Sequence, residues 1–347
     1  MPSGLQIRKE IPLAPFTTFG IGGAARYFAV VTTEEEVVEA VFWAKEHGVP
    51  LFVLGGGSNL LVRDSGFAGL VVKVGVMGVE TSGGNLFDVG AGEVWDRFVE
   101  RMTLLGMAGM ECLAGIPGSV GGTPVQNVGA YGQEVAETIE SVRAFDREKL
   151  EWVELDKAAC RFRYRESLFN TDEPGRYIVT RVRFRLREKG EPNLRYADLL
   201  RRFAGKGGVT LMEVATAVRE IRRSKGMLLV EGDPDCRSAG SFFKNPIVGV
   251  ERLAGIAVAA GVEESKVPHW PAGEGKMKVP AAWLLERAGF VKGYGEGPAG
   301  ISTRHTLALT NRGGATFADV ERLQNEIVRG VRERFGITLE REPVLVG

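Results

Sequence analysis

Residues 109–132 read GMECLAGIPGSVGGTPVQNVGAYG, a stretch rich in glycine with neither a helical nor an alternating period. Loops longer than about 12–15 residues are uncommon in compact domains and are usually functional. A second glycine-rich stretch, GGGSN at residues 55–59, follows the apolar residues 50–54. Glycines let consecutive backbone N–H groups converge on phosphate oxygens. Two such loops therefore suit a ligand with two phosphates, such as a dinucleotide cofactor.

The patterns around these loops predict mixed helices and strands. Helical spacing with capping signals predicts helices over residues 32–48, 94–105, 210–226 and up to residue 336. Short apolar runs predict strands over 25–31, 50–54, 67–74, 86–89 and 337–346. Strict alternation over 178–186 favours a half-solvated antiparallel strand. The glycine- and proline-containing stretch 226–240 is interpreted as a domain boundary.

Composition excludes several classes of protein. The length of 347 residues suggests two or three domains, and 44 basic against 44 acidic residues give no net attraction for nucleic acid or anionic lipid. No run approaches the roughly 20 apolar residues of a membrane span. The 3 cysteines are far apart, which argues against a disulfide framework and for a cytoplasmic setting. The 3 histidines are too scattered to suggest a metal site.

Two further motifs permit more than one interpretation. The stretch GIGGAA at 20–25 matches a dinucleotide fingerprint formally, but the fingerprint needs a strand before it and a helix after it. Prolines precede this stretch and an apparent strand follows it. The stretch CRFRYRESLF at 160–169 interleaves arginines with aromatic residues. It predicts either a stacking surface for nucleic acid or a strand with Phe162 and Tyr164 on one face.

Polar residues near the boundary stretch are candidates for a binding site. Arg222, Arg223 and Lys225 lie at the predicted end of a helix, where they either cap the helix dipole or hold an anionic substrate. Ser241 lies between a glycine and two phenylalanines, which indicates a polar group in a sharply turned apolar setting. The G-x-S-x-G motif of a hydrolase is not present around it.

Taken together, seven stretches resemble the UDP-N-acetylenolpyruvoylglucosamine reductase family. They occur in the family's order over nearly the whole chain: TFGIGG (18–23), LGGGSNL (54–60), AGIPGSVGG (114–122), QNVGAYG (126–132), YRES (164–167), SAGSFFKNP (238–246) and LERE (339–342). The chain departs from the family at Pro343 and Val344, where many members carry Val and Arg.

The resemblance implies an α+β fold. It consists of a vanillyl-alcohol-oxidase/PCMH-type FAD-binding domain in two α/β subdomains and a smaller α+β substrate-binding domain. The expected subdomains are residues 1–68 and 69–225, followed by the substrate-binding domain at 226–336. The strand expected within 337–347 returns to the first subdomain.

The resemblance also implies ligands and site residues. The ligands are noncovalent FAD, NADPH and a UDP-sugar enolpyruvyl ether, which is reduced to UDP-N-acetylmuramate for peptidoglycan, and hence for cell wall biogenesis, cell shape and division. The implied catalytic residues are Arg165, Ser241 and Glu342. The FAD-binding residues are Gly55, Gly56, Gly57, Ser58, Asn59, Gly115, Pro117, Gly118, Ser119, Gly121, Gly122, Asn127 and Ala130; the substrate-binding residues are Tyr131, Tyr196 of the longer family branch, Arg222, Lys225 and Asn245.

The chemistry suits these residue types. Hydride addition to the β-carbon places negative charge beside the substrate carboxylate, which Arg165 can bind through two parallel N–H bonds. Ser241 would protonate the α-carbon. Glu342 would assist as a protonated carboxyl, because burial and like charge raise a carboxyl pKa. The alternatives are another noncovalent flavin oxidoreductase of this fold, or a sugar-nucleotide- or RNA-binding module. We expect no metal, membrane, nucleic acid or obligate protein partner.

Overall fold

A computed structural model describes residues 4–347, which divide into two compact units. The first consists of residues up to Ile11, Ala25–Gly57 and Phe67–Arg223; the second consists of Pro12–Ala24, Ser58–Gly66 and Ser224–Gly347. The boundary after Arg223 lies close to the expected one after residue 225. Residues 12–24 and 58–66, which the sequence prediction placed in the first subdomain, belong to the second unit. The division into three domains stays a prediction.

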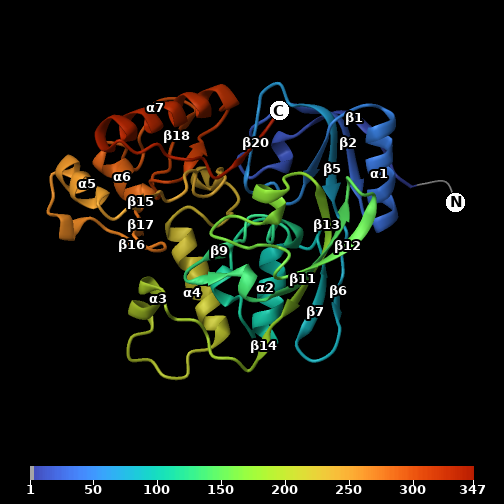
Figure 1. The fold of residues 1–347 in the computed structure, drawn as a ribbon, viewed down its shortest axis with the longest axis horizontal. Coiled ribbons are helices and arrows are strands. Elements are labelled where there is room, and N and C mark those ends of the chain that lie inside the picture. Colours follow the sequence, from blue (N-terminus) through green and yellow to red (C-terminus); the bar gives the residue numbers. More distant parts are fainter. Residues whose placement is uncertain (1–3) are drawn as a thin grey trace. The chain divides into compact units, whose positions relative to one another are not determined.

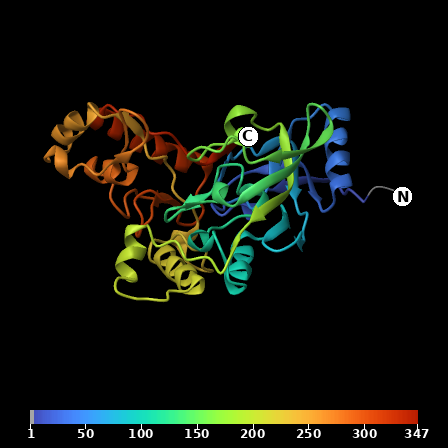
Figure 2. The same cartoon turned by 60° about the horizontal axis from the view of Figure 1, so that its bottom comes forward.

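The first sheet of the first unit has four strands, and its central strands run parallel. Its strand order is β1 (Arg8–Pro12), β2 (Ala24–Val31), β5 (Phe67–Val74), β3 (Leu51–Leu54), and β5 runs parallel to both β2 and β3. Helix α1 (Glu34–Glu46) lies beside these strands in both views and buries Val37 and Val41 in their core (Figures 1 and 2). The helix begins where Thr33 Oγ1 accepts the Glu36 N–H at 3.2 Å, as the capping pattern predicts.

A five-stranded antiparallel sheet forms the rest of this core. Its order is β12 (Glu151–Asp156), β11 (Ile139–Asp146), β13 (Tyr177–Arg185), β7 (Leu86–Gly90), β6 (Val79–Thr81). Helix α2 (Trp95–Leu104) packs on this sheet, and the rings of Phe98 and Phe184 lie 5.3 Å apart. The alternation at 178–186 is confirmed, since Ile178, Val182 and Phe184 are fully buried on β13.

Short elements complete the first unit. Helix α4 (Leu211–Ser224) buries Val214 and Val218, and the short α3 (Ala197–Arg202) buries Leu199. Two short antiparallel pairs join β8 (Met107–Ala108) to β14 (Arg187–Glu188) and β9 (Gly129–Ala130) to β10 (Gln133–Glu134). The 109–132 stretch is largely irregular, as expected.

The second unit has its own core around a long helix. Helix α7 (Phe317–Phe335) buries Val320, Ile327 and Val331 against α5 (Arg252–Ala260) and α6 (Ala281–Arg287). It ends at Gly336, whose φ of +63° favours glycine. The remaining strands are short: β4 (Leu60–Val62) pairs in parallel with β20 (Val344–Val346), β15 (Ile247–Gly249) and β16 (Trp270–Pro271) flank β17 (Lys276–Lys278), and β18 (Ala299–Ile301) pairs with β19 (Leu309–Asn311).

One of the two interpretations of residues 160–169 is wrong, and one predicted strand is shorter than expected. Residues 160–167 form consecutive turns rather than a strand, because Arg161 and Arg165 adopt left-handed φ values of +49° and +60°. The terminal strand is confined to β20, and the only other β-bridge from 337–343 among the described residues joins Arg341 to Phe243. The alternation of arginine and aromatic side chains at 160–167 does not distinguish a strand from consecutive turns. Hydrogen bonds to residues far away in the sequence decide which of the two forms.

Candidate functional site

The two glycine-rich loops of the sequence meet in the structure. A Cβ atom added to Gly56 would lie 2.4 Å from Gly118 Cα and 2.6 Å from Ser119 N. A Cβ atom added to Gly55 would lie 2.9 Å from Ser119 Oγ. These distances are below ordinary van der Waals contact, so only glycine lets the loops approach this closely. The backbone of residues 55–56 is therefore packed directly against residues 118–119.

Ser119 supports a polar ligand at this junction. Its side-chain hydroxyl is buried and, within residues 4–347, has no hydrogen-bond partner. Such a group costs free energy unless a ligand or water satisfies it. The close glycines and the unsatisfied hydroxyl fit the phosphate groups of a dinucleotide such as FAD.

Two other glycines of this loop have a different role from the one expected. Gly121 N–H donates to the Ala91 carbonyl at 2.9 Å, and Gly122 N–H donates to the Ser119 carbonyl at 3.0 Å. A Cβ atom on Gly121 would lie 2.5 Å from Ala91 Cβ. The idea that both supply N–H groups to phosphate is thus corrected: these donors are used within the protein, and Gly121 permits close packing.

The start of the same loop is held by charged side chains. Asp96 of α2 accepts the Gly115 N–H at 2.6 Å and also binds Arg219 at 2.7 Å. Arg222 Nε donates to the Gly115 carbonyl at 2.9 Å. Both polar groups of the Gly115 backbone are therefore fixed from α2 and α4, which limits the movement of the loop.

Arg222, expected either to cap the helix dipole or to hold an anionic substrate, is buried. Burial lowers the pKa of its guanidinium, and its side chain hydrogen-bonds that of Tyr131. Burial also raises the pKa of Tyr131 to about 12, although the positive charge of Arg222 opposes this shift. The rings of Tyr131 and Tyr196 meet edge to face at 5.2 Å. Three predicted substrate-binding residues thus lie together in the first unit.

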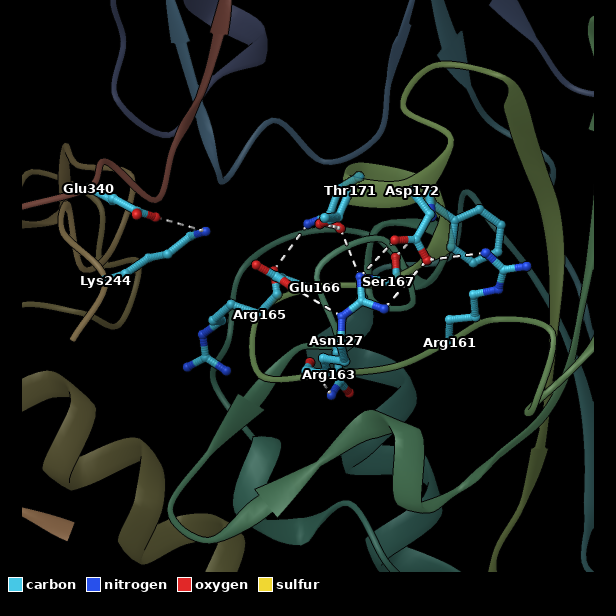
Figure 3. A network of polar contacts seen from close by, with 12 residues as sticks. Asn127, Arg161, Arg163, Arg165, Glu166, Ser167, Thr171, Asp172, Lys244 and Glu340 are labelled. Carbon is cyan, nitrogen blue, oxygen red and sulfur yellow. Dashed lines mark hydrogen bonds and ion pairs between the residues drawn. The ribbon is translucent and has the colours of Figure 1, made fainter. Parts of the chain in front are cut away.

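Arg165 lies at a tight turn of the first unit. Its Nη2 donates to the Gly129 carbonyl at 2.7 Å, and its backbone carbonyl accepts from Asn170 Nδ2 at 3.1 Å. The turn closes through the Arg163 N–H and the Glu166 carbonyl at 2.9 Å (Figure 3). The guanidinium is therefore presented from a fixed backbone.

The segments that carry Ser241 and Glu342 pair in the second unit. The Phe242 carbonyl accepts the Glu342 N–H at 2.9 Å, and the Phe242 N–H donates to the Leu307 carbonyl at 2.7 Å. The Lys244 N–H donates to the Glu340 carbonyl at 2.9 Å, and their side chains form an ion pair at 3.6 Å (Figure 3). This antiparallel register places Glu342 opposite Phe242, so Ser241, which follows Gly240 at φ +74°, lies one residue before the paired segment.

The remaining predicted residues of the second unit have separate backbone contacts. Asn59 Nδ2 donates to the Glu342 carbonyl at 3.4 Å. Asn245 Oδ1 accepts the Ala281 N–H at 2.9 Å at the start of α6. The Ser58 carbonyl accepts the Thr18 hydroxyl at 3.4 Å. Lys225 follows the last residue of α4.

Sequence reasoning missed the residues that fix these segments. Asp235 accepts hydrogen bonds from Thr303 N at 3.0 Å and Arg304 Nε at 3.0 Å, which holds the stretch before Ser241. Glu111 is fully buried and accepts from Gly109 N and Asn193 N, each at 2.8 Å. An isolated carboxylate in a loop gives no local signal of such partners.

Two specific features are absent from residues 4–347. No helix there has both the length and the apolar character needed to cross a bilayer. In the same range, no group of three or more His, Cys, Asp or Glu side chains is arranged to hold a metal ion.

Comparison with known proteins decides the family. A model of an FAD binding domain matches residues 25–155, and one of the UDP-N-acetylenolpyruvoylglucosamine reductase C-terminal domain matches residues 233–346. A protein of Streptomyces coelicolor named UDP-N-acetylenolpyruvoylglucosamine reductase is 49% identical, over 97% of this chain and 90% of its own. The chain belongs to the UDP-N-acetylenolpyruvoylglucosamine reductase family. A Thermobifida fusca relative of the same name is 48% identical over 98% of both chains.

A solved structure agrees with this assignment. The UDP-N-acetylenolpyruvylglucosamine reductase of Thermus caldophilus superposes with a TM-score of 0.69 at 28% identity, covering 99% of this chain and 100% of that one. The predicted resemblance and the α+β fold are confirmed: the chain is an oxidoreductase of the UDP-N-acetylenolpyruvoylglucosamine reductase family, with an FAD-binding domain.

Proposed function

We propose that this enzyme uses NADPH to reduce UDP-N-acetyl-3-O-(1-carboxyvinyl)glucosamine to UDP-N-acetylmuramate, a peptidoglycan precursor, in the cytoplasm. The reactive part of the proposal rests on one observation, the pairing of residues 242–244 with 340–342. This pairing places Glu342 opposite Phe242, the residue after Ser241, and we propose that the Ser241 hydroxyl and the Glu342 carboxyl both reach the substrate. The family assignment supplies the sugar-nucleotide substrate.

FAD would be held noncovalently by the two abutting glycine loops. When bound there, FAD would supply the chemistry of hydride transfer from NADPH to the β-carbon of the enolpyruvyl group. Gly55 and Gly56 allow the backbone to approach the ligand, and the buried Ser119 hydroxyl would donate to a phosphate oxygen. No histidine or cysteine lies within residues 55–59 or 115–130, which supports noncovalent attachment.

Arg165 would bind the substrate carboxylate. The guanidinium stays protonated at all working pH values and can form two parallel N–H bonds to a carboxylate. Its turn is fixed before the substrate arrives, so little side-chain reorganisation is needed as charge develops on the carboxylate oxygens.

Ser241 would donate the proton to the α-carbon. A hydroxyl is a weak acid, so it needs a fixed position and a stabilised conjugate base. The Phe242 hydrogen bonds to Leu307 and Glu342 fix the backbone next to Ser241. Glu342, as a protonated carboxyl, would donate a hydrogen bond to the enolate oxygens.

Tyrosine, lysine and asparagine side chains would bind the substrate and NADPH. Tyr196 is partly exposed and touches the buried Tyr131 ring, so it is suited to cover a bound sugar nucleotide. Lys225 and Asn245 would contact the phosphates and the sugar. Buried Arg222 would position Tyr131 and the Gly115 loop rather than bind the substrate as a solvent-exposed cation.

The decisive experiment separates the two halves of the reaction in Ser241→Ala. We expect bleaching of bound flavin by NADPH to keep its wild-type rate. The rate at which the enolpyruvyl sugar nucleotide restores the colour should fall by roughly 10²- to 10⁴-fold, the usual contribution of a general acid. Ser265→Ala, an exposed serine of the same unit, is the matched control. Slowing of both halves in Ser241→Ala would show that this serine is not the proton donor.

A further inference from the structure

The turn that carries Arg165 is unfavourable by itself. Arg165 has a φ of +60°, in the left-handed region that costs a non-glycine residue about 1–2 kcal/mol. The turn is closed by only two backbone hydrogen bonds, between Arg163 and Glu166 at 2.9 and 3.2 Å. Such a conformation persists only where its surroundings hold it.

Asn127 provides this support from the core side. It is 1% exposed, and its Nδ2 donates to the Arg163 carbonyl at 3.0 Å and to Glu134 Oε2 at 2.8 Å. Its Oδ1 accepts the Ala136 N–H at 3.2 Å. The side-chain oxygen and both side-chain N–H groups are therefore used within the protein, and one of these bonds holds the turn directly (Figure 3).

The same segment also receives the Arg165 guanidinium. Gly129, whose carbonyl accepts from Arg165 Nη2 at 2.7 Å, pairs with Glu134 between β9 and β10. A Cβ atom on Gly129 would lie 3.1 Å from Arg165 Nη1 and 2.9 Å from Glu134 Cγ. Glu134 therefore contacts both Gly129, whose carbonyl binds the Arg165 guanidinium, and Asn127, whose side chain binds the backbone of the turn.

The solvent side of the turn contributes less. Arg163 binds Asp172 at 2.8 Å and Glu166 at 3.1 Å, but 45% of its side chain is exposed. These contacts raise the pKa of Arg163 and lower that of Asp172. Exposed ion pairs contribute little to stability, because solvent screens them and long side chains lose entropy. The buried amide is the stronger constraint.

We propose that Asn127 is a positioning residue for Arg165: its side chain holds the 163–166 turn so that the guanidinium meets the substrate carboxylate. This role rests on the proposed function of Arg165. It differs from the cofactor contact expected for Asn127 from sequence, since the side-chain amide bonds to residues of the turn and the adjacent hairpin rather than to a ligand. Asn127 has a φ of +44°, so Asn127→Gly removes the amide without adding backbone strain.

The test is a double-mutant cycle of Asn127→Gly with Arg165→Ala, measured on FAD-loaded enzyme. Asn127→Gly should slow reoxidation of the flavin by the enolpyruvyl sugar nucleotide by about tenfold to a hundredfold, the usual cost of misplacing a catalytic group. FAD content and the rate of bleaching by NADPH should stay at wild-type values. In the Arg165→Ala background the same change should alter reoxidation less than about twofold, because a positioning residue has no effect without its target.

Other outcomes separate the proposed role of Asn127 from the proposed role of Arg165. Equal effects of Asn127→Gly with and without Arg165, or loss of FAD, would assign Asn127 to cofactor binding or general stability. Wild-type reoxidation by Arg165→Ala would instead refute the proposed role of Arg165. Arg161→Gln, which removes an exposed pair with Asp172 at 3.7 Å, is the control and should leave all rates unchanged. If Asn127→Gly fails to fold, Gly129→Ala takes its place in the cycle, because its new Cβ atom would displace the Arg165 guanidinium. Additive effects of Gly129→Ala and Arg165→Ala on reoxidation would overturn the proposal.

Discussion

Gly56→Ala is the sharpest test of the glycine-loop site. The new Cβ atom would lie 2.4 Å from Gly118 Cα, whereas ordinary contact begins at about 3.4 Å, so the loops must separate by about 1 Å. The neighbouring atoms are backbone, which cannot rotate away. Forcing a methyl group into a packed site usually costs about 1–3 kcal/mol.

This cost should appear mainly in FAD binding. Without ligand, the loops can move apart to accept the methyl group, whereas the proposed FAD-bound form needs them together. A penalty of about 1–3 kcal/mol on the bound form corresponds to a loss of affinity of about 5- to 150-fold. Fluorescence titration of the apoprotein with FAD measures this loss directly.

The matched control is Gly207→Ala. Gly207 is exposed, has nothing within 4 Å of its added Cβ and has no left-handed φ, so its FAD affinity should match wild type. Wild-type FAD affinity in Gly56→Ala, with the protein folded, would show that the two loops do not clasp the cofactor together.

Two further predictions concern single carboxyl groups. Glu342→Gln should keep more activity than Glu342→Asp, because glutamine preserves the length and can still donate a hydrogen bond; the opposite order in steady-state kcat would contradict a protonated Glu342. Arg176 donates to Asp146 at 2.7 Å and lowers the pKa of Asp146 below its usual value of 3.8. The stability that this interaction adds is complete above about pH 4, and it is lost as the pH falls through the lower folded-state pKa. Asp146→Asn should therefore reduce the free energy of unfolding by about 1.5–3 kcal/mol at pH 7, and by much less near pH 2, in urea titrations at both pH values; an equal loss at both would refute the ionic origin.

Local sequence signals predicted the regular elements well. The strand expected at 67–74 is β5, and the capping pair Thr210 and Glu213 begins α4 through bonds of 2.9–3.2 Å. The last helix stops at Gly336, as its position after the apolar stripe indicates. These features depend on residues within a few positions of one another, so their physics is visible in the sequence.

The irregular parts of the candidate site could not be predicted in the same way. The strand considered at 160–169 is replaced over 160–167 by turns, where the buried Asn127, 36 positions before Arg163, binds its carbonyl. The sequence predicts that Arg222 caps a helix or holds an anionic substrate, but it does not predict that Arg222 is buried and bonded to the Gly115 carbonyl, 107 positions away. Long-range hydrogen bonds of this kind leave no period or motif. The glycine loops were the exception, because close backbone approach requires glycine itself.

The central claim is that this chain carries FAD and passes reducing equivalents from NADPH to an enolpyruvyl sugar nucleotide. The most direct measurement is the anaerobic absorbance of the purified protein. The account predicts a flavin spectrum that NADPH bleaches and that stoichiometric UDP-N-acetyl-3-O-(1-carboxyvinyl)glucosamine restores. A folded protein that takes up no FAD, or a bleached flavin that this substrate fails to restore, would contradict it.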